Sequence, residues 1–599
     1  MPVPRRPPLA SVAYLLVGVV LAVGLTWPMP LHPVSTIVGL PQTTGACHLW
    51  VLWWAREHLV ELDSPLLFYP NGGDVMRLYG SDVLSPLLLR WIPLPEPLLY
   101  NGWVLGLLTV GGLGAARLAL RAGAGIGGSW VALAVFEAAP FFQHELLNGT
   151  VELLGASFLP WFVIAMLDVL DAPSWGAGAR AGAWGLAAAW CSIYNLFFLA
   201  LLGSVLLVHR AATTAEALLN GPRLRALALG VAIGGAGLGA LGGVHLLHGA
   251  SETLTERETV LEQEPPAPDA FADLSAWLDP SPAEIPAVVP LPHGEVFEYW
   301  TTATVHLGFV AVGLALFGVL RPSGRRDVAP GPLGSSGAVG PSGAAGPSGA
   351  PWVLLVIVGV LVASGPWLRV GGEKVGLLDG PIPMPALTLS AMVPAFSVTA
   401  PHTYRYASLV VLGLAVLAAR GVRGVWAGRA FAALIAVESL LLSPLPRPTP
   451  VTSVPESAVL DALAGMADGA VLTAPTEADN LYDLGRAMLA QTVHGRPFQD
   501  GGMHHRAGEA SVALFHENAL VEALAARGTR RLPALEPTLR SLGELEEVGY
   551  GYLLVAVEEE DVDTWARETL GPPDLADDIW ALWRLARLPD APEREKESP

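Results

Sequence analysis

Apolar segments, most of them long enough to cross a bilayer, recur along this chain. They lie at 11–31, 98–120, 129–143, 151–170, 182–209, 225–247, 301–320, 351–368, 406–422 and 430–442. A helix of about 20 mostly apolar residues spans the hydrocarbon core of a membrane. Only 15% of the 599 residues are charged, whereas soluble domains carry about 25%. The sequence therefore predicts a mainly α-helical integral membrane protein.

Segment 182–209 decides how the later segments are oriented, because it is long for one membrane helix and short for two. Cytoplasmic loops accumulate Lys and Arg. Only a hairpin that turns near Ser192–Asn195 places Arg180 and Arg210 on the same side as Arg5. We therefore predict a bundle of about eleven transmembrane helices in the cytoplasmic (inner) membrane, with the N-terminus in the cytoplasm.

Residues 1–443 form the predicted transmembrane domain. Its cytoplasmic loop 321–350 is a Gly/Pro/Ser/Ala tract, which cannot bury enough apolar surface to fold and predicts a flexible linker. The long loops expected on the outer side are 32–97, 248–300 and 369–405.

Residues 444–599 form the second predicted domain. Helical patterns there alternate with apolar strand candidates at 469–475 and 551–557, which is typical of a small α/β domain. The predicted orientation places this domain on the extracytoplasmic side. It contains no Gly-rich phosphate loop, HExxH or CxxC motif, so no catalytic motif indicates its role.

Charge and cysteine content exclude two classes of protein. The formal net charge of −20 argues against nucleic acid as a partner. Two cysteines, Cys47 and Cys191, cannot form the disulfide framework of a small secreted scaffold. We expect both to be packing residues.

Several short stretches, taken in order, resemble one family of membrane enzymes. The first helix ends in TWP and is followed by HLWVLWW (48–54) and LFYPNGGD (67–74). FADLSAWLDPSP (271–282), the stretch 383–421, and GAVLTAP with MLAQTVHGRPFQDGG (488–502) continue the pattern. This order is similar to that of bacterial proteins of the GT-C glycosyltransferase superfamily, which includes polyprenyl-phosphate-sugar-dependent mannosyltransferases. The resemblance covers most of the chain.

The resemblance implies a fold and a reaction. It implies a GT-C-like helical bundle that transfers a sugar from a polyprenyl-phosphate-linked donor to a glycan, lipid or protein acceptor at the outer membrane face. A carboxylate in the first outer loop acts as general base or positions the acceptor hydroxyl in such enzymes. Cations or a divalent metal then stabilise the leaving phosphate.

The candidate acids of the first outer loop depart from the family pattern. The family's acidic residue precedes the stretch matching HLWVLWW, but residues 41–48 contain no carboxylate. His48 is a candidate base in its place, and Asp74 and Asp82 are the nearest carboxylates. The alternative interpretations are a packed histidine for His48, a turn-stabilising residue for Asp74 and a helix cap for Asp82.

Four further residues are candidates for the site. Glu145 and Glu152 lie in QHELLNGTVELL (143–154), between apolar segments. Carboxylates near membrane depth usually face a cavity or a partner, although interfacial acids that reach water are the alternative. Arg405 is a candidate ligand for the donor phosphate, because arginine binds phosphate bidentately, and His402 is a candidate assistant. Arginine at a headgroup boundary is otherwise common.

Two other functional classes stay open. The missing acid fits a catalytically degenerate GT-C relative that binds a glycolipid or takes part in envelope assembly. A transporter is the third possibility, but the sequence lacks paired Gly/Pro-interrupted helices in two similar halves. The sequence therefore favours a glycosyltransferase with Asp74, Asp82, Glu145, Glu152 and His48 as candidate catalytic residues.

Overall fold

The chain divides into two compact units, which we call the helical unit and the mixed unit. The helical unit comprises Met1–Trp27, Trp103–Leu146 and Val151–Thr449, and the mixed unit comprises Pro28–Gly102, Leu147–Thr150 and Pro450–Pro599. The computed structural model describes residues 8–40, 44–58, 63–75, 82–213, 220–241, 272, 274, 277, 305–320, 349–370, 373–377, 380–393, 396, 402–442, 447–475, 481–500, 517–525 and 532–587.

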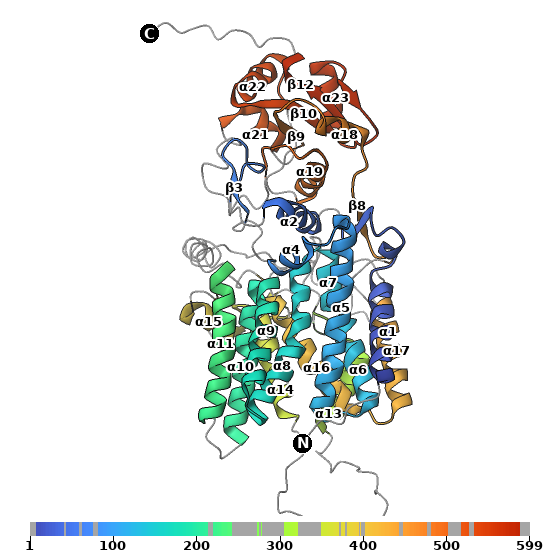
Figure 1. The fold of residues 1–599 in the computed structure, drawn as a ribbon, viewed down its shortest axis with the longest axis vertical. Coiled ribbons are helices and arrows are strands. Elements are labelled where there is room, and N and C mark those ends of the chain that lie inside the picture. The colour runs from blue at the N-terminus through green and yellow to red at the C-terminus, as the bar shows by residue number, and fades with distance from the viewer. Residues whose placement is uncertain are drawn as a thin grey trace, which may run out of the picture. The chain divides into compact units, whose positions relative to one another are not determined.

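The helical unit is a bundle of apolar helices, several of which run side by side (Figure 1). Among the described residues, four segments are long and apolar enough to cross a membrane: Glu96–Arg121, Val151–Asp171, Ile193–Thr213 and His402–Gly421. Three apolar helices are shorter: Val12–Leu25, Phe309–Leu320 and Ala350–Ala363. The protein is therefore a multi-pass membrane protein, and the number of eleven spans stays a prediction.

The described helices of the helical unit are α1 (Pro8–Leu25), α5 (Glu96–Arg121), α6 (Ile126–Glu137), α7 (Pro140–Leu147), η2 (Val151–Phe158), α8 (Leu159–Asp171), α9 (Trp175–Cys191), α10 (Ile193–Thr213), α11 (Gly221–Leu241), α13 (Phe309–Leu320), α14 (Ala350–Ala363), α15 (Pro385–Met392), α16 (Ala407–Gly421) and α17 (Val425–Leu441).

A single extended residue separates α9 from α10. Ser192 has φ −160° and ψ 140°, which ends the helix after Cys191. Helix α9 begins at Trp175 instead of residue 182, so the two helices have 17 and 21 residues. The hairpin predicted for this segment is confirmed, and its helices are longer than expected.

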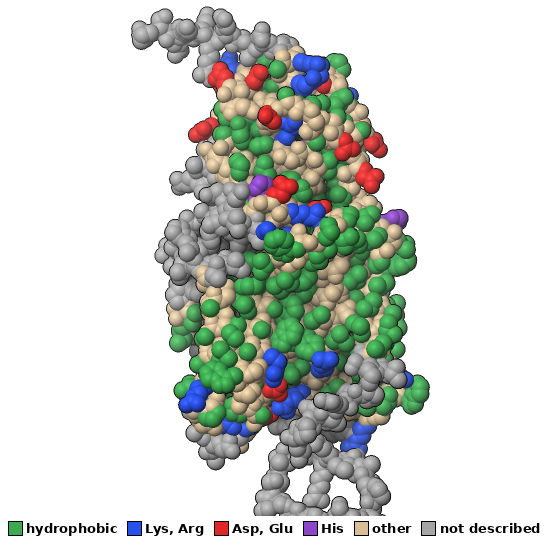
Figure 2. Space-filling view, viewed as in Figure 1, with side chains coloured by type: hydrophobic (Ala, Val, Ile, Leu, Met, Phe, Trp, Pro, Cys, Tyr) green, Lys and Arg blue, Asp and Glu red, His purple; other side chains and the backbone are tan. Residues whose placement is uncertain are grey.

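Arginine and aspartate side chains collect at one end of the helical unit, where Figure 2 shows blue and red side chains below a band of apolar ones. Arg121 pairs with Asp171 at 2.6 Å, and Arg210 lies 3.2 Å from the same carboxylate. Arg180 lies 3.2 Å from Asp168. The ends of α5, α8 and α10 and the start of α9 therefore meet at one end, as the hairpin requires.

Glycines allow close packing between helices of the bundle. A Cβ atom on Gly318 of α13 would lie 2.0 Å from the Leu417 carbonyl oxygen of α16, and one on Gly421 would lie 2.2 Å from the Leu314 oxygen. Small residues let membrane helices approach closely, and dispersion contacts then hold them together. The α13–α16 pair depends on this approach.

The mixed unit contains a four-stranded sheet in the order β11-β12-β10-β9. Strands β12, β10 and β9 are labelled in Figure 1. Strands β9 (Ala470–Ala474) and β10 (Tyr550–Ala556) are parallel, and β12 (Trp580–Arg584) runs antiparallel to β10 and to β11 (Leu575–Ala576). Buried side chains of alternating strand residues form two apolar clusters, one with Leu553 and Val555 and the other with Leu554. The small α/β region predicted for the C-terminal part is confirmed. Its described helices are α18 (Ala458–Ala464), α19 (Leu481–His494), α21 (Ala519–Ala525), α22 (Leu535–Val548) and α23 (Glu560–Leu570).

The first outer loop belongs to the mixed unit, unlike the predicted boundary, which assigns it to the transmembrane domain. Its helix α2 (Gly45–His58) buries Trp50 and Trp54 in one cluster with Met488 of α19. The Trp50 indole N–H donates to Gln491 Oε1 at 2.5 Å. Apolar burial explains why the loop and the C-terminal part form one unit, because the tryptophans of α2 are buried against side chains of the C-terminal part. The loop follows η1 (Met29–Leu31). It also contains β1 (Thr36–Val38), which pairs with β8 (Val451–Ser453), as well as β2 (Asp63–Ser64), β3 (Gly73–Asp74) and α4 (Leu84–Leu89).

The two other predicted outer loops are only partly described. Of loop 248–300, three positions are described, and the linker 321–350 lies outside the described residues except for its last two positions. Loop 369–405 contains two short hairpins, β4 (Arg369–Val370) with β5 (Glu373–Lys374) and β6 (Gly376–Leu377) with β7 (Gly380–Pro381).

Candidate functional site

The candidate donor-phosphate ligand Arg405 lies just before α16 in the helical unit. Its guanidinium carbon is 4.6 Å from the centroid of the Tyr194 ring of α10 and 5.8 Å from that of Tyr404. Both tyrosines are buried, whereas Arg405 is partly exposed. Aromatic faces attract a guanidinium through their quadrupole, so the two rings restrict where this cation can lie.

The candidate acids Glu145 and Glu152 are in the same part of the helical unit. Glu145 lies near the end of α7 and is 0% exposed, and Glu152 lies at the start of η2 and is 8% exposed. Both carboxylates interact electrostatically with Arg405. Charges of opposite sign stabilise one another strongly where water is excluded. The structure therefore brings three of the predicted site residues together.

Two histidines contact the ring of Tyr404, which lies beside Arg405. The rings of His144 and Tyr404 meet edge to face, with centroids 5.7 Å apart. His402 also lies edge to face with Tyr404, at 6.2 Å. His402 is therefore placed beside the arginine-binding tyrosine, and His144 is a neighbour that the sequence analysis did not select.

Tyr194 was not predicted as a partner of Arg405. It follows the break at Ser192, within a run of polar residues inside an otherwise apolar segment. Asn195, in the same run, is fully buried and donates from Nδ2 to the Ala188 carbonyl at 3.0 Å. A polar run at membrane depth was the available signal, because polar groups there usually face a partner or a cavity.

The other candidate residues lie in the mixed unit and form a separate pair. His48 Nδ1 of α2 is 3.9 Å from Asp82 Oδ2, and the side chains are 13% and 4% exposed. The Asp82 carboxylate also accepts hydrogen bonds from the Ser85 backbone N–H at 3.1 Å and from its hydroxyl at 2.5 Å. Asp82 therefore stabilises the first turn of α4, and its Oδ2 atom lies near the His48 imidazole, beyond direct hydrogen-bond distance.

Asp74 lies in strand β3, where its backbone pairs with Asp63 of β2. It follows a turn in which Gly72 has φ +76°, a conformation that suits glycine. The placement of its side chain lies outside what the structure describes. The structure thus supports a turn at this position and leaves a catalytic role for Asp74 as a prediction.

No group of three or more His, Cys, Asp or Glu side chains with metal-binding geometry occurs among the described residues. The pair His48 and Asp82 supplies two ligand types, imidazole and carboxylate, that suit divalent cations. A divalent metal therefore stays a prediction.

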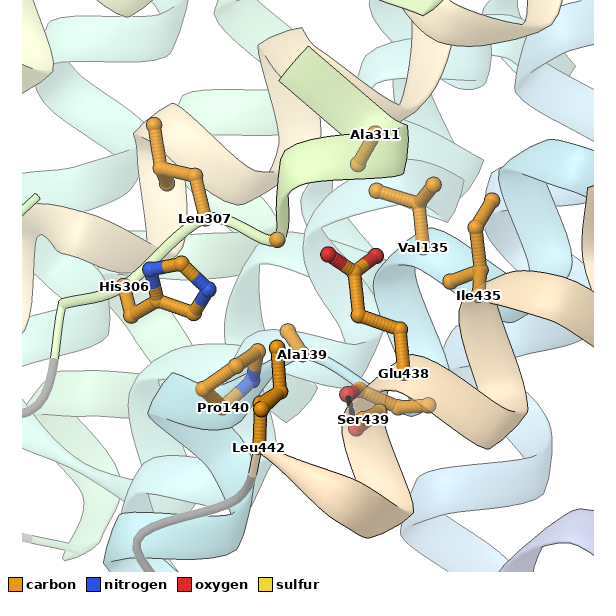
Figure 3. A pocket seen from close by; sticks show the side chains of 12 residues that line it. Val135, Ala139, Pro140, His306, Leu307, Ala311, Ile435, Glu438, Ser439 and Leu442 are labelled. Atoms are coloured by element: carbon orange, nitrogen blue, oxygen red, sulfur yellow. Dashed lines mark hydrogen bonds between the residues drawn. The ribbon is translucent and has the colours of Figure 1, made fainter. Parts of the chain in front are cut away.

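A small cavity lies elsewhere in the helical unit, beside the Glu438 carboxylate (Figure 3). Its volume is about 20 Å³, which holds about one water molecule. Glu438 of α17 accepts hydrogen bonds from the Phe309 N–H at 2.6 Å and the Val310 N–H at 3.2 Å. A carboxylate at a helix N-terminus is favourable, so Glu438 caps α13 and the cavity is too small for a sugar. His306 lines the same cavity.

Comparison with solved structures identifies the fold. The mycobacterial arabinofuranosyltransferase AftD matches 92% of this chain with a TM-score of 0.52 and 14% identity. A mutant of AftD matches 92% with a TM-score of 0.51 and 12% identity. The oligosaccharyltransferase AglB from Archaeoglobus fulgidus matches 93% of this chain and 70% of its own, at 12% identity, with a TM-score of 0.44, which is too low to add to the fold assignment.

The chain shares its fold with AftD, so the polytopic helical fold with a small α/β domain expected from the sequence is confirmed. It spans about a third of the length of AftD, 35% in the first match and 37% in the second. No protein-family model and no curated protein sequence matches the chain.

Proposed function

We propose that this protein is a membrane glycosyltransferase that transfers a sugar from a polyprenyl-phosphate-linked donor to a glycan, lipid or protein acceptor. The observation that carries the proposal is the partly exposed Arg405, which is flanked by Tyr194 and Tyr404 and interacts with Glu145 and Glu152. The fold shared with an arabinofuranosyltransferase supports the same activity. The transfer takes place at the outer face of the cytoplasmic membrane.

In this proposal Arg405 binds the phosphate of the donor. The bond between the anomeric carbon and the phosphate oxygen breaks, and polyprenyl phosphate leaves with the bonding electron pair. A guanidinium fixed next to that oxygen stabilises the charge that develops on it. Arginine offers two parallel N–H donors to a phosphate, and His402 beside Tyr404 is placed to assist.

The acceptor hydroxyl forms the new bond to the anomeric carbon and loses its proton to a base. Glu145 and Glu152 are candidates for this base because they lie in the same unit as Arg405. The pair of His48 and Asp82 is the second candidate, since an imidazole nitrogen and a carboxylate oxygen lie 3.9 Å apart there. A divalent metal held by carboxylates would supply further charge stabilisation to the leaving phosphate.

A transfer assay with the full-length protein in nanodiscs tests the proposal. The donors are radiolabelled polyprenyl-phosphate pentoses and hexoses, offered with glycan and lipid acceptors from bacterial envelopes. We expect labelled product with the unsubstituted protein and loss of product with Arg405→Ala. Arg429→Ala is the matched control, because Arg429 also lies against aromatic rings, those of Trp130 and Trp426, in the same unit. Equal product from both variants would contradict the role of Arg405.

A catalytically degenerate relative that binds a glycolipid is the second candidate function. The absence of a carboxylate in residues 41–48 favours it. This candidate predicts that polyprenyl phosphate binds with Arg405-dependent affinity while no acceptor is glycosylated. Binding measured by native mass spectrometry, next to the transfer assay, separates the two functions.

A further inference from the structure

A buried glutamate that plays no part in the candidate site lies among three apolar helices of the helical unit. Glu137, at the end of α6, is 1% exposed. A Cβ atom on Gly112 of α5 would lie 2.2 Å from the Glu137 Oε2 atom, and one on Gly18 of α1 would lie 3.3 Å from the same oxygen. The two glycines therefore leave the space that this carboxyl group fills.

The carboxyl group lies far from the charged end of the helices that surround it. Gly112 stands nine residues before Arg121, the last residue of α5, which is about 14 Å along the helix axis. Helix α1 contains no Asp, Glu, Lys, Arg or His, and Glu137 is the only such residue of α6. A carboxylate at such a depth is costly, and it usually has a partner or faces a cavity.

Glu137 has no such partner among the described residues. Neither Oε1 nor Oε2 forms a hydrogen bond with them. The Ala22 backbone N–H of α1 approaches the carboxyl group without reaching hydrogen-bond geometry. No described cation interacts with the group electrostatically. An ionised carboxylate without a partner in an apolar interior costs much free energy, so the group is neutralised by a proton instead.

The charged and titratable side chains on the helices around Glu137 are engaged elsewhere. Arg429 of α17 lies against the rings of Trp130 and Trp426, and Glu438 of the same helix caps α13. His144 and Glu145 of α7 belong to the candidate site, and the remaining groups are Arg117, Arg121, Arg420 and Tyr14, whose partners are Trp161, Asp171, the Ala122 carbonyl and Ser129, respectively. None of the described cations can neutralise Glu137 without leaving its present partner, so a proton is the ligand that suits this packing.

Helix α1 is the part of this surrounding that is least held by the bundle, and it lies at the edge of the helical unit in Figure 1. Its exposed large side chains are Val12, Leu15, Leu16, Val17, Val19 and Val20. The packed face of α1 carries Gly18 and stacks Tyr14 on Trp130 of α6, with ring centroids 4.0 Å apart. Ionisation of Glu137 would leave a bare carboxylate against Gly18, and only a separation of the helices would admit water to it.

We propose that Glu137 is a proton-binding site within the helical unit, and that release of its proton separates α1 from α5 and α6. In the packed arrangement the group is a neutral carboxylic acid. The O–H bond is the one that breaks, the electron pair stays on the carboxylate oxygen, and the proton passes to water. The inference uses no residue of the candidate site, and it holds whether or not the protein transfers a sugar.

Dicyclohexylcarbodiimide, an apolar reagent for protonated carboxyl groups, tests the proton-binding site in the full-length protein in nanodiscs. The carboxyl O–H adds across one C=N bond of the reagent: the proton goes to nitrogen, the oxygen bonds to carbon, and transfer of the acyl group to nitrogen gives a stable N-acylurea. Glu145 is the matched control, because it is 0% exposed but interacts with Arg405.

We expect peptide mass spectrometry to find the adduct at Glu137 in mildly acidic buffer, less of it in alkaline buffer, and none at Glu145. A Glu137 that does not react, or that reacts no more than Glu145, would overturn the proposal. An adduct whose yield is the same in both buffers would also overturn it, because the proton would then not be released.

Distances between spin labels test the separation of α1. The labels are attached to Val20→Cys of α1 and Val437→Cys of α17, whose side chains are 70% and 49% exposed. Val208→Cys of α10, 61% exposed, with Val437→Cys is the matched control pair, because it does not include α1. The unsubstituted protein gives the labelling background, since both native cysteines are buried.

We expect the distance from α1 to α17 to lengthen between mildly acidic and alkaline buffer, and the control pair to keep its distance. Glu137→Gln, which has the shape of the neutral acid, should keep the short distance and the thermal stability of the unsubstituted protein in both buffers. An unchanged distance in the presence of Glu137 would overturn the proposal, and so would the same lengthening in Glu137→Gln. Loss of stability in Glu137→Gln in acidic buffer would contradict a neutral carboxyl group.

Discussion

The guanidinium carbon of Arg405 lies 4.6 Å from the centroid of the Tyr194 ring. The two residues come from α10 and from the start of α16, so the contact joins separate parts of the bundle. The position of the arginine therefore depends on the break at Ser192, which places Tyr194 at the first turn of α10. A cation positioned in this way is ready to receive an anion without a costly rearrangement.

Removal of the Tyr194 ring should weaken donor binding. Cation–π contacts contribute about 0.5–2 kcal/mol, so Tyr194→Leu should raise the Kd for polyprenyl phosphate by roughly 2–30-fold. Tyr194→Phe keeps the ring and should bind within about threefold of the unsubstituted protein. Native mass spectrometry in nanodiscs measures both. Equal weakening by the two substitutions would show that the hydroxyl, and not the ring, is required.

Neutral isosteres at the buried acids should separate catalysis from binding. Glu145→Gln or Glu152→Gln should lower kcat by roughly 10²–10⁴-fold in at least one case, as expected when a general base is lost. Binding of polyprenyl phosphate should persist in that variant. Glu438→Gln is the control, because this acid caps α13 and its variant should keep transfer. Unchanged kcat in both glutamine variants would exclude these acids as the base.

The pair of His48 and Asp82 can be tested by a double-mutant cycle. If the two side chains, 3.9 Å apart, act as one proton-transfer unit, His48→Gln and Asp82→Asn should each lower kcat, and the double variant should be no slower than the worse single one. Ser85→Ala reports on the cap of α4 alone, since the Ser85 hydroxyl donates to the Asp82 carboxylate. A loss of rate in Ser85→Ala equal to that in Asp82→Asn would indicate a structural role.

Acidification should destabilise the mixed unit through His494. Burial, together with the nearby Arg496, lowers the pKa of His494 from 6.5 to about 3. The unfolded chain therefore binds a proton that the folded chain does not, so stability is complete above pH 6.5 and falls as the pH drops towards 3, by at most about 1.4 kcal/mol per pH unit. The free energy of unfolding at each pH is obtained from the urea dependence of Met488 oxidation by hydrogen peroxide. Met488 is buried in this unit, so unfolding exposes it to the oxidant. The pH dependence should be shallower in His494→Asn, and an identical slope would contradict the assignment.

A methyl group at Gly318 should disrupt the bundle. Its Cβ would lie 2.0 Å from the Leu417 carbonyl oxygen, so α13 and α16 must separate, at a cost of about 1–3 kcal/mol. Gly318→Ala should lower the thermal unfolding temperature in detergent. Gly313→Ala is the matched control on the same helix, because nothing lies within 4 Å of the point that its Cβ would occupy. Equal unfolding temperatures for the two variants would show that the close approach is dispensable.

Local patterns predicted much of the fold. The polar run near Ser192 and the distribution of arginines predicted the α9–α10 hairpin, and the ion pairs of Arg180 and Arg210 agree with it. Strands β9 and β10 were predicted because short apolar runs alternate there with helical patterns. Strand β12 was not, because its sequence WALWR is a short run of five residues and its pairing with β10 is a long-range feature.

The candidate site was harder to predict from the sequence, because its contacts join residues that are far apart along the chain. Arg405, Glu145 and Glu152 were selected one by one, and only the structure shows that they interact. The pairing of Arg405 with Tyr194 depends on helix packing, which hydropathy does not encode. The contact between His48 and Asp82 likewise requires the relative placement of α2 and α4.

The hydrogen bond between Trp50 and Gln491 joins residues 441 positions apart. At a synthesis rate of roughly 5–20 residues per second, on the order of 20–90 s pass between the emergence of the two partners. During this interval helix α2, with Trp50 and Trp54, lacks the apolar core that later covers it. Biogenesis of this protein therefore includes a period in which an aromatic helix is vulnerable to aggregation and proteolysis, and a holding chaperone would be most useful then.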